Sequence, residues 1–341
     1  MTISRTLLAT TAMTLIGSTS LIGCSKSAET GESESTTSNS TNDVTYTIAV
    51  IAKSNSNPPF LAAKTGALDA AARLSKELDG VTVKVNWQTP PQEDAQLQAQ
   101  YVEQLVASGI NGIAISVSDA NTLNGAIQDA VSKGVVVVTF DSDAPDSGRM
   151  AYYGVDDKEA GRELMRQLAP LLDGHGTVAV LTGNPAAANL SARVAGVVEE
   201  ADNFEGINIK QVFSFMPETA TEAVAKMQQA QIANPDINGW ALVGGWPLYT
   251  DNALDGIYEN AKVVSMDPLP LPIAYAQKGQ VQVLVGQPYY GWGEKSVEMI
   301  VDKLNLDIKP ASELVFAEFD IVTKDNADEY LKKWDAWLKD D

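Results

Sequence analysis

The chain alternates short runs of β-branched residues with longer stretches in which apolar residues recur at helical spacing. Runs of the first kind are typical of strands, and apolar residues three and four positions apart are typical of helices that cover a sheet. In the first half, this pattern predicts strands at 47–52, 81–87, 112–117 and 135–140 and a helix at 96–108. The last of these strands is a continuous Val/Thr/Phe run, which favours a strand covered on both faces.

A second series of similar size follows the polar stretch 141–148, which contains Gly and Pro. It predicts helices beginning near 158 and 191, helices at 220–232 and 295–304, strands at 177–182, 207–213, 240–243, 262–266, 281–285 and 314–321, and a final helix at 326–338. Alternating strands and helices indicate an α/β protein with parallel sheets, and two consecutive series predict two lobes. Ligands of open α/β sheets bind at the carboxyl ends of strands, so residues just after strands are the candidates for a site.

The N-terminal segment has the pattern of a lipoprotein signal peptide. Arg5 precedes an apolar stretch, 7–22, that is diluted by Thr and Ser and ends in Leu21-Ile22-Gly23-Cys24. This pattern predicts a signal over 1–23, cleavage before Cys24 and a lipid anchor on the Cys24 thiol. The alternative is a membrane-spanning helix with an incidental cysteine, but the stretch is shorter than the roughly 20 residues that a span needs.

Residues 24–44 form the next segment, which is rich in Ser, Thr and Glu and has almost no apolar residues. Such a segment cannot bury enough surface to offset the entropy of ordering it, so we expect a disordered linker. Together, the signal and the linker predict a folded part held outside the cytoplasm, in the periplasm or at the cell surface, by its lipid anchor.

Charge and cysteine content narrow the possible functions. The chain has 24 Lys and Arg against 44 Asp and Glu, a net charge of −20, which becomes −21 when Arg5 leaves with the signal. An acidic surface repels phosphate backbones, so we expect no nucleic-acid partner. With the only cysteine at position 24, the mature fold has no disulfide and no thiolate metal site. The 297 residues from position 45 onward suffice for one large or two medium domains.

Several segments, taken in order, resemble the type I periplasmic sugar-binding proteins of ABC transporters, the ribose-binding family. The first contains that family's Asn-Pro-x-Phe element, and the resemblance covers roughly residues 46–325. The matching segments are IAVIAKSNSNPPFLAAKTGALDAAARL, GINGIAIS, GVVVVTFDSD, YYGVDDKEAG, NLSARVAGV, VVSMD and GQPYYGWGEKSVEMI.

The resemblance implies a fold, a function and a set of partners. Two lobes, 45–156 plus 288–320 and 157–287 plus 321–341, would be joined by three crossings and would close on a monosaccharide or similar polyol. The protein would be a monomer without a cofactor that delivers its ligand to an ABC permease and its ATPase. A sensing module for a chemoreceptor or histidine kinase remains an alternative, as does an extracytoplasmic carbohydrate enzyme.

Ligand contacts carried over from the family fall mostly just after predicted strands. The matching positions are Asn57, Phe60, Ser116, Asp141, Arg193, Asp267 and Gln287. Carboxylates accept hydrogen bonds from sugar hydroxyls, Arg and Asn donate them, and an aromatic ring covers the apolar face of a sugar. Other interpretations stay open: the two aspartates as caps or turn residues, Arg193 as a surface ion pair, and Phe60 as ordinary core.

Departures from the family pattern affect the choice of ligand. Pro59 replaces an aromatic residue, Ser142 stands where an arginine is common, and Gly244-Gly245 replaces an Asn-Asp pair. These losses make ribose itself doubtful.

Three further positions join the predicted ligand-binding set. Lys53 and the run 140–143 resemble the rhamnose- and autoinducer-binding branch of the family. The match is incomplete, because this chain has Asn189 and Gly244-Gly245 where that branch has aspartates. Trp246 is predicted either to stack on the ligand or to pack under the following helix. The predicted ligand is a hexose, a deoxysugar or a similar polyol.

No catalytic constellation is evident, so we expect a non-enzyme. The only histidine, His175, lies in an Asp-Gly-His-Gly turn, where a solvated side chain is the simplest interpretation. Asp141-Ser142-Asp143 has the D-x-D form of some metal-dependent transferases, but so short a match is common by chance, and no metal site is predicted. A phosphate-binding G-x-x-x-x-G-K-[ST] loop is missing from the sequence, so the chain is not expected to be the transport ATPase.

Overall fold

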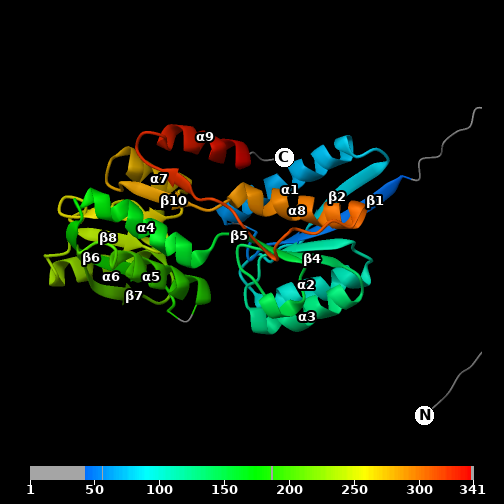
Figure 1. Ribbon diagram of the computed structural model, residues 1–341, viewed down its shortest axis with the longest axis horizontal. Helices are drawn as coiled ribbons and strands as arrows, with labels where there is room; N and C mark the ends of the chain where they lie inside the picture. The colour runs from blue at the N-terminus through cyan, green and yellow to red at the C-terminus, as the bar shows by residue number, and fades with distance from the viewer. Residues whose placement is uncertain (1–42, 56, 186, 339–341) are drawn as a thin grey trace, which may run out of the picture. The chain divides into compact units, whose positions relative to one another are not determined.

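The computed structural model of the protein describes residues 43–55, 57–185 and 187–338. The predicted signal, Cys24 and nearly all of the predicted linker lie outside the described residues. Within residues 43–338 the chain forms two six-stranded sheets with helices on both faces of each (Figure 1). The expected α/β fold with two largely parallel sheets is therefore confirmed.

The first sheet is built from most of the first series of elements and from a strand near the C-terminus. Its strands, in spatial order, are β11 (Leu314–Phe316), β5 (Ala151–Gly154), β4 (Val136–Phe140), β3 (Gly112–Ile115), β1 (Val44–Ile51) and β2 (Val81–Trp87), all parallel. Helices α1 (Pro58–Glu77) and α8 (Tyr289–Leu306) cover one face, and α2 (Ala95–Ala107) and α3 (Ala120–Ser132) cover the other.

The second sheet repeats this order. Its strands, in spatial order, are β12 (Asp320–Val322), β10 (Val283–Gly286), β9 (Lys262–Met266), β8 (Gly239–Leu242), β6 (His175–Thr182) and β7 (Gly206–Ser214), with only β12 antiparallel. Helices α4 (Asp157–Leu171) and α5 (Ala188–Ala201) cover one face, and α6 (Ala220–Ala233), α7 (Pro270–Gln277) and α9 (Ala327–Trp337) lie on the other. Single 3-10 turns occupy Pro145–Ser147 and Trp246–Tyr249.

The chain passes between the two sheets three times, at residues 155–156, 287–288 and 317–319. The predicted single strand 314–321 is wrong, because its two ends belong to different sheets. Leu314 pairs with Tyr152 in the first sheet, whereas Asp320 pairs with Gly286 in the second. The predicted linker also extends one residue too far, since Val44 pairs with Val81 as the first residue of β1.

The central strands are buried on both faces, as their unbroken apolar runs predict. Residues 48–52 are fully buried.

Glycines let two pairs of helices approach each other closely. A Cβ at Gly293 of α8 would overlap the carbonyl oxygen of Ala63 in α1, and one at Gly161 of α4 would overlap the carbonyl oxygen of Arg193 in α5. The backbone of Arg193 is thereby held against α4, a contact that matters for the site.

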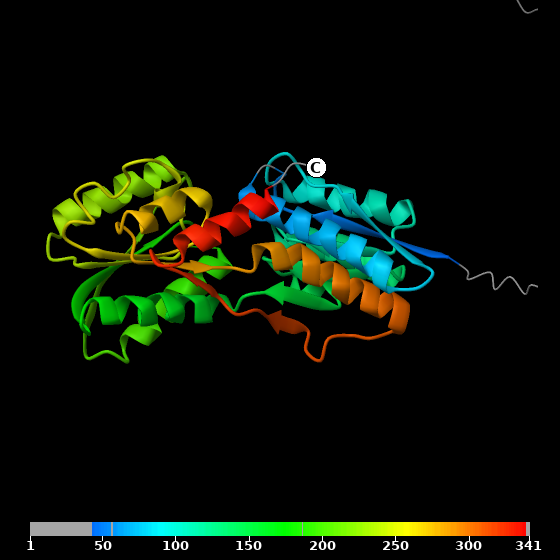
Figure 2. The same cartoon turned by 90° about the horizontal axis from the view of Figure 1, so that it is seen from above.

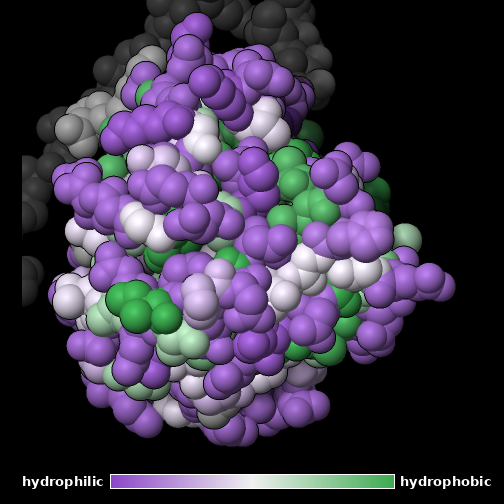
Figure 3. Space-filling view, turned by 90° about the vertical axis from the view of Figure 1, so that its left-hand side faces the viewer, coloured by the Kyte–Doolittle hydropathy of each residue, from purple (hydrophilic) through white to green (hydrophobic). Residues whose placement is uncertain are grey.

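The C-terminal helix α9 packs against helices of both sheets. It lies beside α7 and α1, as Figure 2 shows from above. The buried Trp334 donates from Nε1 to the carbonyl oxygen of Pro268 at 2.7 Å, and Thr65 of α1 donates to the carbonyl oxygen of Trp337 at 2.6 Å. The face at the second-sheet end is largely hydrophilic, with hydrophobic residues in small separate groups (Figure 3), in keeping with the net charge of −20.

Candidate functional site

The main candidate site is a cleft of about 1010 Å³ at the carboxyl ends of strands from both sheets. Its first-sheet wall includes Lys53 after β1, Asp141 after β4 and Tyr152 of β5. Its second-sheet wall includes Asn189 at the start of α5 and Trp246 after β8. Parallel sheets gather their loops at this edge, which is where ligands of such folds bind.

Asp141 is held at the centre of the first-sheet wall. Its backbone is left-handed, with φ 59°. The contacts that described residues make with its carboxylate all go to one oxygen, Oδ2. Ser116, fully buried after β3, donates to Oδ2 at 2.7 Å, and Lys53 Nζ lies 3.3 Å from the same atom. Lys53 also donates to the hydroxyl of Ser142 at 2.5 Å. The other oxygen, Oδ1, accepts no hydrogen bond from any described residue, so it can accept one from a ligand hydroxyl.

Asp267 holds the equivalent position after β9 but is fully engaged by the protein. Its φ is also left-handed, 69°, and its amide donates to the carbonyl oxygen of the next strand as that of Asp141 does. Its four donors are the amide of Gly245 (3.1 Å), the side chain of Gln287 (3.2 Å) and the hydroxyls of Tyr249 (3.3 Å) and Tyr289 (3.1 Å). Four donors fill the acceptor sites of a carboxylate, so in this structure Asp267 organises the second-sheet wall.

Arg193 lies behind this wall and is 5% exposed. Its guanidinium pairs with Asp157 at 2.8 Å, donates to the carbonyl oxygen of Val243 at 3.2 Å and approaches Gln287 Oε1 at 3.4 Å. Asp157 opens α4 just after the first crossing, and Gln287 lies in the second crossing. Arg193 therefore links the first residue of α4, next to the first crossing, to Gln287 in the second crossing.

The electrostatics of this pair follow from burial. Burial raises the pKa of the Asp157 carboxyl, and the nearby Arg193 opposes that rise. Burial lowers the pKa of Arg193, but Asp157 and Asp267 outweigh this effect, and the net pKa lies above its usual value. Arg193 is therefore positively charged, and the half-buried carboxylates of Asp157 and Asp267 balance its charge.

Two departures from the family pattern acquire a structural reason. Gly244 leaves room for the ring of Trp246, which a Cβ at that position would overlap. A Cβ at Gly245 would lie only 3.0 Å from the ring and the hydroxyl of Tyr249, and the Gly245 amide donates to Asp267. Trp246 is half-buried, lies edge-on to Phe215 with ring centres 5.5 Å apart, and also lines the cleft. Both predicted roles, packing and exposure to a ligand, are compatible with this position.

Not all predicted positions converge on the cleft. Lys53, Asp141, Asn189 and Trp246 line it, and Ser116 contacts Asp141 from behind. Phe60 lies in the core instead, 6% exposed, with its ring centre 6.0 Å from that of Trp292. Asn57 is exposed at the N-terminus of α1 and is not part of the cleft lining.

Sequence reasoning missed Tyr152 and Asp157, which line the same cleft. The Tyr152 hydroxyl donates to the backbone oxygen of Asp141 at 3.1 Å, and burial raises its pKa above the usual range. The available signal is the position of the segment 152–157, which ends a strand and begins a helix, where ligand-binding residues of such folds gather.

No group of three or more potential metal ligands is found among residues 43–338 that the structure describes. His175 begins β6, is exposed, and has Nδ1 2.9 Å from the carbonyl oxygen of Asp173. In the same part of the chain, no helix combines the length and apolar character needed to cross a bilayer.

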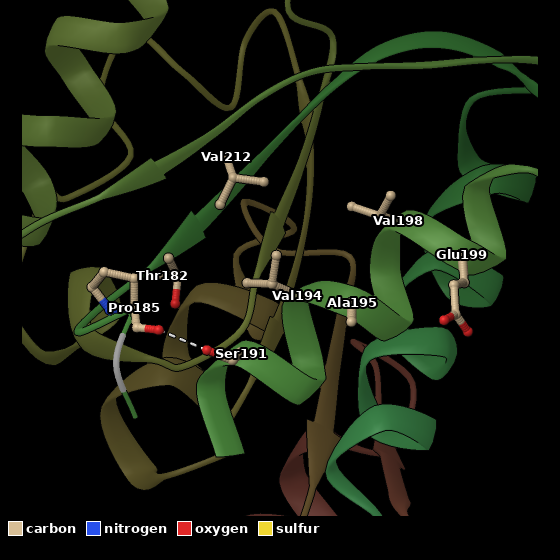
Figure 4. A pocket seen from close by; sticks show the side chains of 8 residues that line it. All are labelled: Thr182, Pro185, Ser191, Val194, Ala195, Val198, Glu199 and Val212. Carbon is tan, nitrogen blue, oxygen red and sulfur yellow. Dashed lines mark hydrogen bonds between the residues drawn. The ribbon is translucent and has the colours of Figure 1, made fainter. Parts of the chain in front are cut away.

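A second, smaller pocket of about 450 Å³ lies beside α5 and the edge strand β7 (Figure 4). Its wall is mainly Val194, Val198 and Val212. The hydroxyl of Ser191 is engaged by the carbonyl oxygen of Pro185 at 2.7 Å, and Glu199 pairs with cations of α4. Few polar groups remain to orient a hydrophilic ligand, so the cleft is the better candidate site.

Comparisons with known proteins agree with this geometry. The family model described as periplasmic binding protein domain matches residues 48–307. The chain is 28% identical over 200 residues to the ribose import binding protein RbsB of Bacillus subtilis, which is 59% of this chain and 62% of that relative. The match thus spans about three fifths of the relative's length.

Solved structures extend the similarity over the whole fold. A solute-binding protein of an ABC transporter from Burkholderia graminis, in complex with D-arabinose, aligns with a TM-score of 0.72 and 26% identity over 82% of this chain and 96% of that one. A sugar-binding protein of a Bacillus halodurans ABC transporter aligns with a TM-score of 0.75 and 25% identity over 84% and 100%. The chain belongs to the periplasmic binding protein domain family.

Proposed function

We propose that this protein captures a sugar or similar polyol in the cleft and delivers it to an ABC permease. The observation that carries the proposal is Asp141, which lines a cleft walled by both sheets and whose Oδ1 has no donor among the residues that the structure describes. A half-buried acceptor beside Lys53 and Ser142 suits a ligand rich in hydroxyl groups. The relatives named above, which include a ribose import protein and a protein with D-arabinose bound, support the same ligand class.

Binding would be converted into a change of shape. We propose two lobes, 44–156 plus 288–316 and 157–287 plus 320–341, with residues 317–319 as the third crossing, as the pairing of β11 and β12 indicates. A ligand that contacts both walls favours the closed arrangement in proportion to its extra contacts there. The closed arrangement would be the one that a permease recognises.

The proposal places the protein outside the cytoplasm, tethered by lipid on Cys24. Family membership supports the extracytoplasmic location. The lipid anchor is inferred from the sequence around Cys24 and from the Ser/Thr/Glu-rich segment that follows it. A tether raises the effective concentration of the protein near its permease, provided that the linker spans the gap.

A thermal-shift panel tests the proposed ligand class. We expect at least one of D-ribose, D-arabinose, D-xylose, D-allose, D-glucose, D-galactose and myo-inositol to raise the melting temperature. A ligand at 100 times its dissociation constant adds about 2.7 kcal/mol of apparent stability. The protein should also return the sugar chemically unchanged after long incubation. A flat response to every sugar and polyol, with amino acids or anions active instead, would overturn the proposal.

A further inference from the structure

One wall of the cleft carries an apolar surface, here called the apolar shelf, made of Tyr152, Leu314 and Phe316. All three line the cleft. Strand β11 lies parallel to β5, with Leu314 opposite Tyr152 and Phe316 opposite Gly154. Alternate residues of a strand point to the same side, so Leu314 and Phe316 share a face, whereas Val315 between them packs on the core.

This face is unusually exposed for a surface made of large hydrophobic side chains. Leu314 is 45% exposed and Phe316 is 49% exposed, although both are large hydrophobic residues on the edge strand of a sheet. Edge strands usually carry charge or proline to blunt their surface, and neighbouring exposed apolar groups commonly mark a binding surface. Figure 2 shows this strand along the first sheet, between α8 and the third crossing.

The shelf is continuous with the proposed sugar site. The ring of Phe316 lies edge-on to that of Tyr152, with centres 6.3 Å apart, and the Tyr152 hydroxyl donates to the backbone of Asp141 at 3.1 Å. Gly154, which pairs with Phe316, has no side chain to cover the Phe316 ring. A ligand bound at Asp141 therefore has an aromatic surface beside it on the first-sheet wall.

The cleft leaves room for a ligand larger than one sugar ring. Its volume before any closure of the lobes is about 1010 Å³, at the top of the range of about 300–1,000 Å³ for pockets that enclose drug-sized ligands. The cleft lining has more carboxylates, Asp143 and Asp156 among them, than cations, which are Lys53 and Lys158, so its net negative charge disfavours an anionic group on the ligand.

We propose that the apolar shelf binds a second, uncharged ring joined by a glycosidic bond to the sugar held at Asp141. Its flat apolar face would lie against Phe316 and Leu314, as aromatic side chains accommodate both aryl groups and the C–H faces of sugars. The ligand would then be an aryl glycoside or a disaccharide. This inference rests on the proposed function and extends it from the sugar head to the group attached to it.

Titration calorimetry with matched ligands tests the shelf. For each sugar that responds in the thermal-shift panel, the probes are the free sugar, its methyl glycoside, its phenyl glycoside and a disaccharide that contains it. We expect the phenyl glycoside or the disaccharide to bind at least about tenfold more tightly than the methyl glycoside, because a ring is buried on the shelf. Which of the two shows the gain identifies the kind of ring.

Variants then assign the gain to the shelf. Phe316→Ser and Leu314→Ser replace exposed side chains and should leave the fold and the affinity for the free sugar within about twofold of wild type. Both should remove most of the advantage of the second ring. Leu306→Ser, at an equally exposed residue near the end of α8 outside the cleft, should remove none of it.

Two results would overturn the inference. Phenyl glycosides and disaccharides that bind no better than the methyl glycoside, while the free sugar binds, would reject the shelf and leave the proposed function intact. An advantage that survives in the double variant of Leu314 and Phe316 would also reject the shelf. If neither free sugars nor glycosides bind, the proposed function itself fails, and the shelf proposal fails with it.

Discussion

Replacing Asp141 by Asn should weaken sugar binding by at least about thirtyfold, because a charged acceptor in a half-enclosed site contributes about 2 kcal/mol or more to binding. The substitution keeps the size of the side chain but removes the charge that faces Lys53 at 3.3 Å. It also places an NH₂ group on a side chain whose Oδ1 is the open acceptor of the first-sheet wall. Titration calorimetry with the sugar that gives the largest thermal shift measures the effect.

Asp119→Asn is the matched control for this experiment. Asp119 also lines the cleft, and its side chain caps α3 by accepting from the amide of Thr122 at 2.7 Å. Asn caps helices about as well as Asp, so both the fold and the affinity should be preserved. If Asp141→Asn binds within threefold of wild type, or if Asp119→Asn loses as much affinity as Asp141→Asn does, Asp141 is not the anchor of the ligand.

Replacing Arg193 by Met should lower the free energy of unfolding by about 3–5 kcal/mol, the typical cost of leaving a buried charge without its partner. Asp157 would lose a cation at 2.8 Å, and the carbonyl oxygen of Val243 and Gln287 Oε1 would each lose a donor. Because Arg193 links the start of α4 to Gln287 in the second crossing, we also expect weaker sugar binding. Urea denaturation measures the stability change.

Arg162→Met is the control for Arg193→Met, because it removes only surface ion pairs of the same two helices, α4 and α5. Arg162 of α4 pairs with Glu159 and Glu199 at the surface, where such contacts contribute about 0–1 kcal/mol. Adding Asp157→Asn to Arg193→Met should recover part of the lost stability, since no unpaired carboxylate then remains. Equal losses for the two arginine variants, or no recovery in the double variant, would contradict a structural role for the buried pair.

The periodic part of the fold could be predicted from the sequence. Strand 262–266 occurs where its apolar run places it, because a buried parallel strand needs continuous apolar residues. Strand 81–87 lies at the edge of the first sheet, where alternating apolar and polar residues with β-branched side chains were the signal. Helix α7 was missed because its segment, with Pro270 and Pro272, resembles a turn, although proline is tolerated in the first turn of a helix. Strand β5 was missed because four residues after a polar stretch carry too little periodicity.

For the candidate site, the sequence predicts only that its residues lie just after strands. Asp141 and Asp267 follow equivalent strands, and the family pattern treats both as ligand contacts. Their difference depends on long-range contacts: the donors that fill Asp267 come from a 3-10 turn and from the second crossing, and Arg193 meets Asp157 across 36 positions in the sequence. Sequence periodicity does not encode such pairings, so the division between an open and a filled carboxylate emerges only in the structure.

The central claim is that a sugar binds between the two sheets with Asp141 as its anchor. The most direct test is a crystal structure of the protein with the sugar that gives the largest thermal shift. We predict a sugar hydroxyl within hydrogen-bond distance of Asp141 Oδ1 and a contact of the same ring with Trp246 or Asn189 on the second-sheet wall. A sugar bound outside this cleft, or one that leaves Asp141 Oδ1 without a contact, would contradict the account.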